Sequence, residues 1–138
     1  MTPLEELKAR YAQYEKELTA AHQAHPFGGY LGFGTDARRD PCNMRFYEDV
    51  QAWTADLASA CPDPDTAAQV VEWLLFAPEG RQKELAFPFL VATQGHARML
   101  IGALADADRA AFAARYDKAF PKYQRLPVQK EVLKMLRA

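Results

Sequence analysis

The longest run of apolar residues in the chain spans residues 84–104 and predicts a central helix. Within it, one helical stripe consists of Leu85, Phe89, Ala92, His96, Met99 and Ala103, and further apolar positions are Leu90, Val91, Leu100, Ile101 and Leu104. A helix that is apolar around most of its circumference has to be enclosed by other helices. Pro88 lacks a backbone N–H, so we expect a kink there or a separate short turn before the helix.

Cap and proline signals divide the rest of the chain into helices with one buried stripe each. Thr2-Pro3-Leu4-Glu5 is a capping box that starts a helix running to about His22. Further starts are predicted by Asp40-Pro41, Asp63-Pro64, Asp106 and Pro127, and further ends by Pro62, Pro78 and Pro121. The predicted stripes are Leu4, Leu7, Tyr11, Tyr14 and Leu18; Phe46, Val50, Trp53, Leu57 and Cys61; Ala67, Val70, Val71, Leu74 and Leu75; Phe112, Tyr116, Ala119 and Phe120; Val128, Val132, Met135 and Leu136.

Residues 25–40 form the one long connection, because they hold four of the seven glycines and show no helical period. Connections of this length are usually functional or mobile. The sequence therefore predicts an all-α fold: a single-domain bundle over residues 1–138, with five or six helices around the central helix at about 84–104. The long Gly/aromatic loop at 25–40 is the first place to look for a site.

Composition and charge restrict the classes of function. The chain has 138 residues, 49% of them hydrophobic, and a net charge of −1. Residues 115–138 carry seven basic and two acidic side chains, but the near-neutral net charge of the whole chain argues against a nucleic-acid partner. Polar residues inside the apolar run make it a poor membrane span, and no signal peptide is recognisable, so we expect a cytoplasmic protein without a membrane partner. Cys42 and Cys61 lie roughly 28 Å apart along one predicted helix, too far for a disulfide.

The long loop offers aromatic and glycine residues that could receive a ligand. Phe27, Tyr30 and Phe33 provide flat apolar surfaces, and the glycines between them allow backbone N–H groups to approach an anion. The spacing does not match a dinucleotide-binding motif, which also needs a preceding strand. The alternative is that the aromatic rings close the end of the bundle as a lid.

The end of this loop and the start of the helix that follows it hold the most reactive side chains. Cys42 is predicted at the second position of a helix, where the helix dipole favours a thiolate or a bound anion, and Arg38 and Arg39 lie just before it. A thiol nucleophile also needs a base, and His25 lies in the same loop. The alternative is that Cys42 packs as a small apolar residue and the arginines are solvated.

The remaining candidate residues lie on predicted core helices. His96 falls on the central stripe, where a histidine either bonds a core partner or lines a pocket. Trp73 and Phe76 lie off the stripe of their helix, so that this helix is apolar on two sides; either neighbouring helices cover both sides or one binds a partner. No catalytic set, metal-ligand motif or cofactor motif is recognisable.

These patterns favour a non-enzymatic protein-interaction or self-associating module, with a protein partner or a homodimer as the expected assembly. The alternative is a small-molecule-binding protein or an enzyme with its site under the loop, using Cys42 and the neighbouring arginines and histidine.

Overall fold

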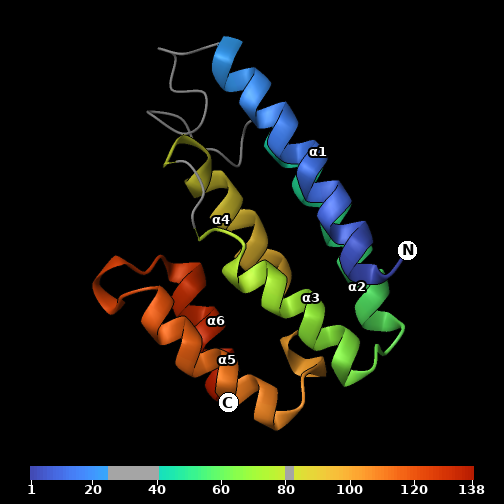
Figure 1. Cartoon of the computed structure of the whole chain (residues 1–138), viewed down its shortest axis with the longest axis vertical. Helices are drawn as coiled ribbons and strands as arrows, with labels where there is room; N and C mark the ends of the chain where they lie inside the picture. The colour runs from blue at the N-terminus through green and yellow to red at the C-terminus, as the bar shows by residue number, and fades with distance from the viewer. Residues whose placement is uncertain (25–40, 80–82) are drawn as a thin grey trace.

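The computed structural model describes residues 1–24, 41–79 and 83–138, and all regular structure in these ranges is helical (Figure 1). The side chains of residues 18, 21–24, 41–43 and 83–88 fall outside this description. The helices are α1 (Pro3–Ala24), α2 (Pro41–Ser59), α3 (Pro64–Phe76), α4 (Lys83–Ala97), η2 (Ile101–Ala103), α5 (Asp106–Ala119), η3 (Lys122–Gln124) and α6 (Pro127–Arg137). The all-α helical bundle expected from the sequence is confirmed; the predicted loop at 25–40 lies outside the described residues.

Local cap chemistry sets the starts of the helices. At α1, Thr2 Oγ1 accepts the backbone N–H of Glu5 at 3.2 Å, and Glu5 accepts the N–H of Thr2 at 3.3 Å, as the capping box predicts. At α3, Asp63 accepts both the backbone N–H of Thr66 at 2.8 Å and its hydroxyl at 2.9 Å. These hydrogen bonds lower the pKa of the Asp63 carboxyl. Each cap satisfies N–H groups that the first helical turn leaves without a carbonyl partner.

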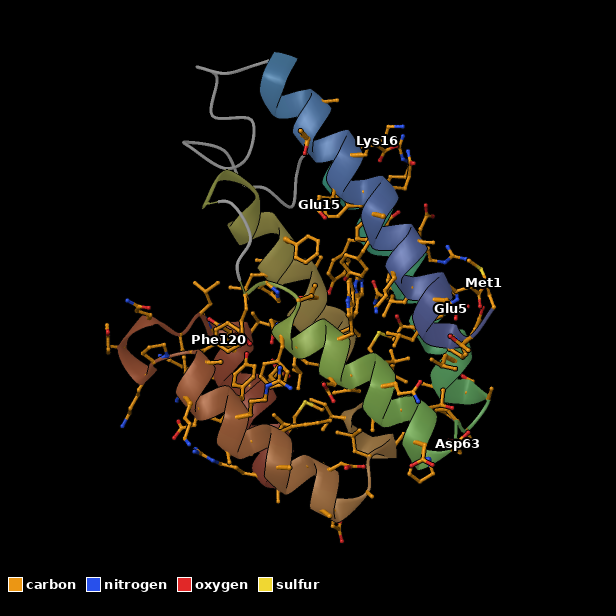
Figure 2. The ribbon with its side chains drawn as sticks, viewed as in Figure 1. Met1, Glu5, Glu15, Lys16, Asp63 and Phe120 are labelled. Atoms are coloured by element: carbon orange, nitrogen blue, oxygen red, sulfur yellow. The ribbon has the colours of Figure 1, made fainter. Side chains whose placement is uncertain are left out.

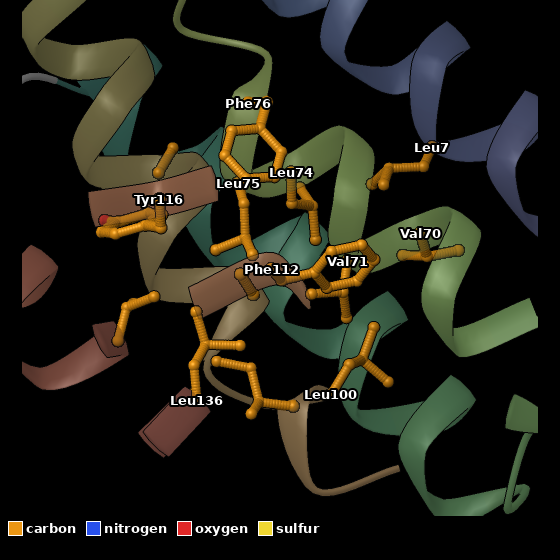
Figure 3. Packing of buried hydrophobic residues seen from close by; sticks show 14 of the residues in the cluster. Leu7, Val70, Val71, Leu74, Leu75, Phe76, Leu100, Phe112, Tyr116 and Leu136 are labelled. Atoms are coloured by element: carbon orange, nitrogen blue, oxygen red, sulfur yellow. The ribbon is translucent and has the colours of Figure 1, made fainter. Parts of the chain in front are cut away.

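Helix α3 occupies the middle of the bundle (Figure 1). It packs against α1 and α4 on one side and against α5 on the other, while α6 packs against α4 and α5. Figure 3 shows how side chains of α1, α5 and α6 pack against those of α3. The labelled core residues are Leu7, Val70, Val71, Leu74, Leu75, Phe76, Leu100, Phe112, Tyr116 and Leu136, all buried. Burying side chains of this size contributes roughly 1.5 to 3 kcal/mol each before ordering entropy is counted.

The apolar run at 84–104 is not one helix. Helix α4 ends at Ala97, a turn follows, and the chain continues as the short helix η2. Leu100, Ile101 and Leu104 are nevertheless buried, so the run is enclosed as predicted although its helix is shorter. Pro88 lies inside α4, and no separate turn precedes it in the described residues.

Two details of the predicted stripes and one predicted cap are wrong. Cys61 is exposed, because α2 ends at Ser59 and Cys61 takes a left-handed backbone φ of 53°. Asp106 is the first residue of α5 and Ala105 is its cap, so Asp106 stabilises the helix through the dipole of the first turn. The buried face of α6 is rotated toward Gln129 and Leu133, since Gln129 turns inward and accepts the backbone N–H of Leu126 at 2.9 Å.

Acidic and basic residues are concentrated in different segments of the chain. Figure 2 shows Asp63, at the corner between α2 and α3, on the opposite side of the molecule from Phe120, where α5 gives way to η3. Acidic residues dominate the described chain from 44 to 79, and basic residues dominate from 115 to 138. None of the helices in the described ranges combines the length and the apolar character that crossing a bilayer requires.

Candidate functional site

A buried histidine on α4 links this helix to α1 and α2. His96 on α4 is fully buried, with Nδ1 2.7 Å from the hydroxyl of Tyr11 on α1 and Nε2 3.1 Å from the carbonyl oxygen of Tyr47 on α2. A carbonyl oxygen only accepts hydrogen bonds, so Nε2 carries the proton and donates it. Nδ1 is then the acceptor, and the Tyr11 hydroxyl donates to it. The contacts therefore fix one tautomer of a neutral ring.

Burial also fixes the charge of this pair. Burial, with a smaller contribution from the positive charge of Arg98, lowers the pKa of His96 from 6.5 to about 4, although the hydrogen bond to Tyr47 opposes the shift. The same burial raises the pKa of Tyr11 well above its ordinary value. Both groups are neutral at pH 7. The pair therefore holds α1, α2 and α4 together as a neutral hydrogen-bonded unit.

Gln94 forms a second buried linkage two residues before His96 on α4. Its Nε2 donates to the carbonyl oxygens of Leu74 at 3.3 Å and Leu75 at 3.2 Å, which belong to the last turn of α3 and have no helical N–H to accept. Its Oε1 accepts the hydroxyl of Tyr116 on α5 at 2.7 Å. Burial raises the pKa of Tyr116, so this hydroxyl keeps its proton. Gln94 thus closes the end of α3 and attaches α5 to it.

The two aromatic residues predicted to form a second apolar face are covered by the chain's own helices. Phe76 is 7% exposed, and the guanidinium of Arg115 on α5 lies 3.8 Å from its ring centroid. The ring of Trp73 is half-buried, with its centroid 5.1 Å from that of Tyr11 and 6.5 Å from that of Phe89. Helix α3 is apolar on two sides because α1 and α5 pack on them. The hypothesis of a partner-binding face on α3 therefore loses its motivation.

Most of the other candidates are not placed. His25, Phe27, Tyr30, Phe33, Arg38 and Arg39 lie outside the described residues. Cys42 is the second residue of α2, as predicted, but its side chain also lies outside them. Among the side chains that are described, no three of histidine, cysteine, aspartate or glutamate gather as metal ligands would.

The structure adds a surface feature that sequence reasoning missed: an open groove of about 600 Å³ between α5 and the end of α6. Its lining consists of Asp106, Arg109, Ala110, Ala113, Ala114, Asp117, Leu136, Arg137 and Ala138. The apolar lining residues are alanines and Leu136, and the charged ones lie toward the start and the end of α5 and at the end of α6. We refer to this feature as the α5–α6 groove.

Ion pairs border both ends of the α5–α6 groove. Asp106 accepts a hydrogen bond from Arg109 at one end. At the other, Asp117 pairs with Arg125 and lies 3.6 Å from Arg137. These cations lower the pKa of the Asp117 carboxyl, chiefly through the bond to Arg125. Helix α5 is rich in alanine, but this composition does not by itself indicate a groove.

Comparisons of the chain with protein-family models, with curated proteins and with solved structures found no match.

Proposed function

We propose that the chain is a non-enzymatic helical module of the cytoplasm that binds a protein partner or a second copy of itself. The observation that carries the proposal is the α5–α6 groove, which is open, runs along α5 and has alanines as most of its apolar lining residues. Such grooves receive a helix of a partner, because small residues let two helix backbones approach closely.

The distribution of polar groups supports the same function. His96, Gln94, Tyr11 and Tyr116, the fully buried polar or hydroxyl-bearing side chains that touch one another in the core, bond to each other or to backbone carbonyls. Their geometry serves the packing of the helices. The α5–α6 groove, in contrast, presents alanine methyl groups to solvent and holds its charged residues at the two ends.

The exposed thiol of Cys61 fits a reducing compartment such as the cytoplasm, where a free cysteine at the surface is not oxidised to a disulfide.

The test is the mass of the assembly that the chain forms, measured once with the purified chain and once in a cell extract. Sedimentation velocity gives the mass of the purified chain, and size-exclusion chromatography of a native cell extract, followed with an antibody, gives the mass of the assembly in the cell. We expect a species heavier than the monomer in at least one of them. A monomer in both measurements would overturn the proposal.

A further inference from the structure

The two hydrogen bonds of His96 attach different helices and use the ring in opposite ways. Nε2 donates its proton to the carbonyl oxygen of Tyr47 on α2, whereas Nδ1 accepts the hydroxyl proton of Tyr11 on α1. A protonated imidazole carries a proton on both nitrogens and has no acceptor left. Protonation therefore keeps the bond to α2 and abolishes the bond that Tyr11 donates.

The hydroxyl group of Tyr11 has no substitute for this bond. Within the described part of the chain, the side chain of Tyr11 forms no hydrogen bond other than the one to His96. If its oxygen accepted the new proton of Nδ1, its own proton would be left without an acceptor in a core of aromatic rings. The ring centroids of Phe46, Trp73 and Phe89 lie 4.8, 5.1 and 5.3 Å from that of Tyr11. A buried polar group without a partner is costly.

We infer that acid releases α1 from the bundle while α2 stays docked, so that the docking of α1 depends on the protonation of His96. Release of α1 brings water to Nδ1, and water accepts the added proton. Burial holds the pKa of His96 at about 4 while α1 is docked, whereas a ring that reaches water is protonated nearer its ordinary value of 6.5.

The described surroundings of His96 offer no negative charge that would stabilise its cation. From α1 and α2 it faces Tyr11 and Tyr47, which are neutral at this pH, at ring-centroid distances of 6.2 and 4.6 Å. On its own helix it faces Arg98, a cation, and Glu131 of α6 pairs with that arginine at 2.8 Å. The acidic residues of α3, Asp65 and Glu72, are exposed. Protonation is therefore opposed as long as α1 remains in place.

Helix α1 is attached to the bundle by few buried side chains. Among the described side chains of this 22-residue helix, Leu7, Tyr11 and Tyr14 are buried, whereas the 13 residues of α3 include six buried ones. An element with few buried contacts opens at a lower free energy than the whole domain unfolds. An isolated helix is marginal in water, so the released α1 loses its backbone hydrogen bonds and its amide hydrogens exchange with solvent.

Hydrogen exchange of the full chain, followed by mass spectrometry of its peptides, tests the release. Protection factors, which remove the intrinsic effect of pH on exchange, are compared at pH 7 and pH 5, in urea from zero to just below unfolding. We expect the protection of α1 to fall by up to about 20-fold, the factor that pKa values of 6.5 and about 4 give. This fall should be independent of urea, because a local opening exposes little surface, whereas exchange of α5 through global unfolding accelerates with urea. Helix α2 should stay more protected than α1 at pH 5.

Two tyrosine variants form a matched pair. Tyr11→Phe and Tyr116→Phe each remove one buried hydroxyl that bonds to α4, but the partner of Tyr116 is the amide of Gln94, which does not titrate. Tyr11→Phe should lower the protection of α1 at pH 7 about tenfold, and Tyr116→Phe should leave it unchanged. His96→Gln should give α1 the same protection at both pH values.

A urea-independent fall that is confined to α1 and absent from His96→Gln supports the inference. It is overturned if α1 of the unmodified chain is equally protected at pH 7 and pH 5, or if α1 and α2 open together. Exchange of α1 with the same urea dependence as α5 also overturns it, since the opening would then be global. These three outcomes need only the unmodified chain, so the test stands even where a variant does not fold.

Discussion

Acidification should destabilise the fold through His96, and the structure gives both the direction and the size of the effect. The unfolded chain binds a proton at this imidazole near pH 6.5, whereas the folded chain does so only near pH 4. Between these values the unfolded state binds more protons, so the free energy of unfolding falls as the pH is lowered. Above pH 6.5 both states are neutral and the full stabilisation is present.

The magnitude follows from the pKa difference. Each pKa unit corresponds to about 1.4 kcal/mol, so the complete loss, reached below pH 4, is roughly 3.4 kcal/mol. Between pH 7 and pH 5 the same expression gives about 1.8 kcal/mol. The carboxyl pKa values of Asp63 and Asp117 are lowered below 3.8, so these two groups titrate below this pH window.

Urea unfolding followed by tryptophan fluorescence at pH 7 and pH 5 measures the effect, because Trp73 is half-buried against Tyr11 and Phe89 and reports on the core. His96→Gln is the control: its side chain does not titrate, and the other histidines are present in both proteins. The unmodified chain should lose about 1.8 kcal/mol more than the variant. A difference below about 0.5 kcal/mol would refute the assignment of a buried neutral imidazole.

Two further predictions concern the enclosed apolar run. Leu100→Ala should lower the free energy of unfolding by roughly 2 to 5 kcal/mol, because Leu100 is fully buried outside any helix of the described chain; a loss under about 0.5 kcal/mol in urea titration would mean that the site is not enclosed. Gly95→Ala should be less stable than Gly102→Ala in thermal unfolding: the added Cβ would lie 2.5 Å from the hydroxyl oxygen of Tyr47 at position 95 but meets nothing within 4 Å at position 102. Equal melting temperatures would contradict the packing described for Tyr47.

The sequence predicted most of the helix starts because cap chemistry is local. Pro41, Pro64 and Pro127 each open a helix as expected, and a proline at the first helical position needs only its own fixed φ and its missing N–H. The end of α4 could not be predicted in the same way. Residues 98–104 are as apolar as those before them, and apolar character indicates burial without specifying a helix.

The core linkages were beyond sequence reasoning for a different reason. Tyr11 and His96 are 85 positions apart, and a helical period identifies a buried face but not the residue that it meets. The burial of Phe76 likewise depends on Arg115 and Phe112 of α5, which pack on it only once the bundle has formed. The α5–α6 groove is created by the spacing of two helices, so its alanines were unremarkable in the sequence.

The hydrogen bonds of His96 and Gln94 restrict how four positions of the core can change in evolution. His96 is matched to Tyr11, and Gln94 to Tyr116, each at 2.7 Å inside the core. Replacing either member alone leaves a buried polar atom without its hydrogen bond, at a cost of about 1 to 3 kcal/mol. Replacing both together avoids this cost when the new residue at position 96 or 94 still donates a hydrogen bond to the backbone carbonyls that His96 and Gln94 bond. Positions 11 and 96 should therefore vary together in any lineage that retains this fold, and so should positions 94 and 116.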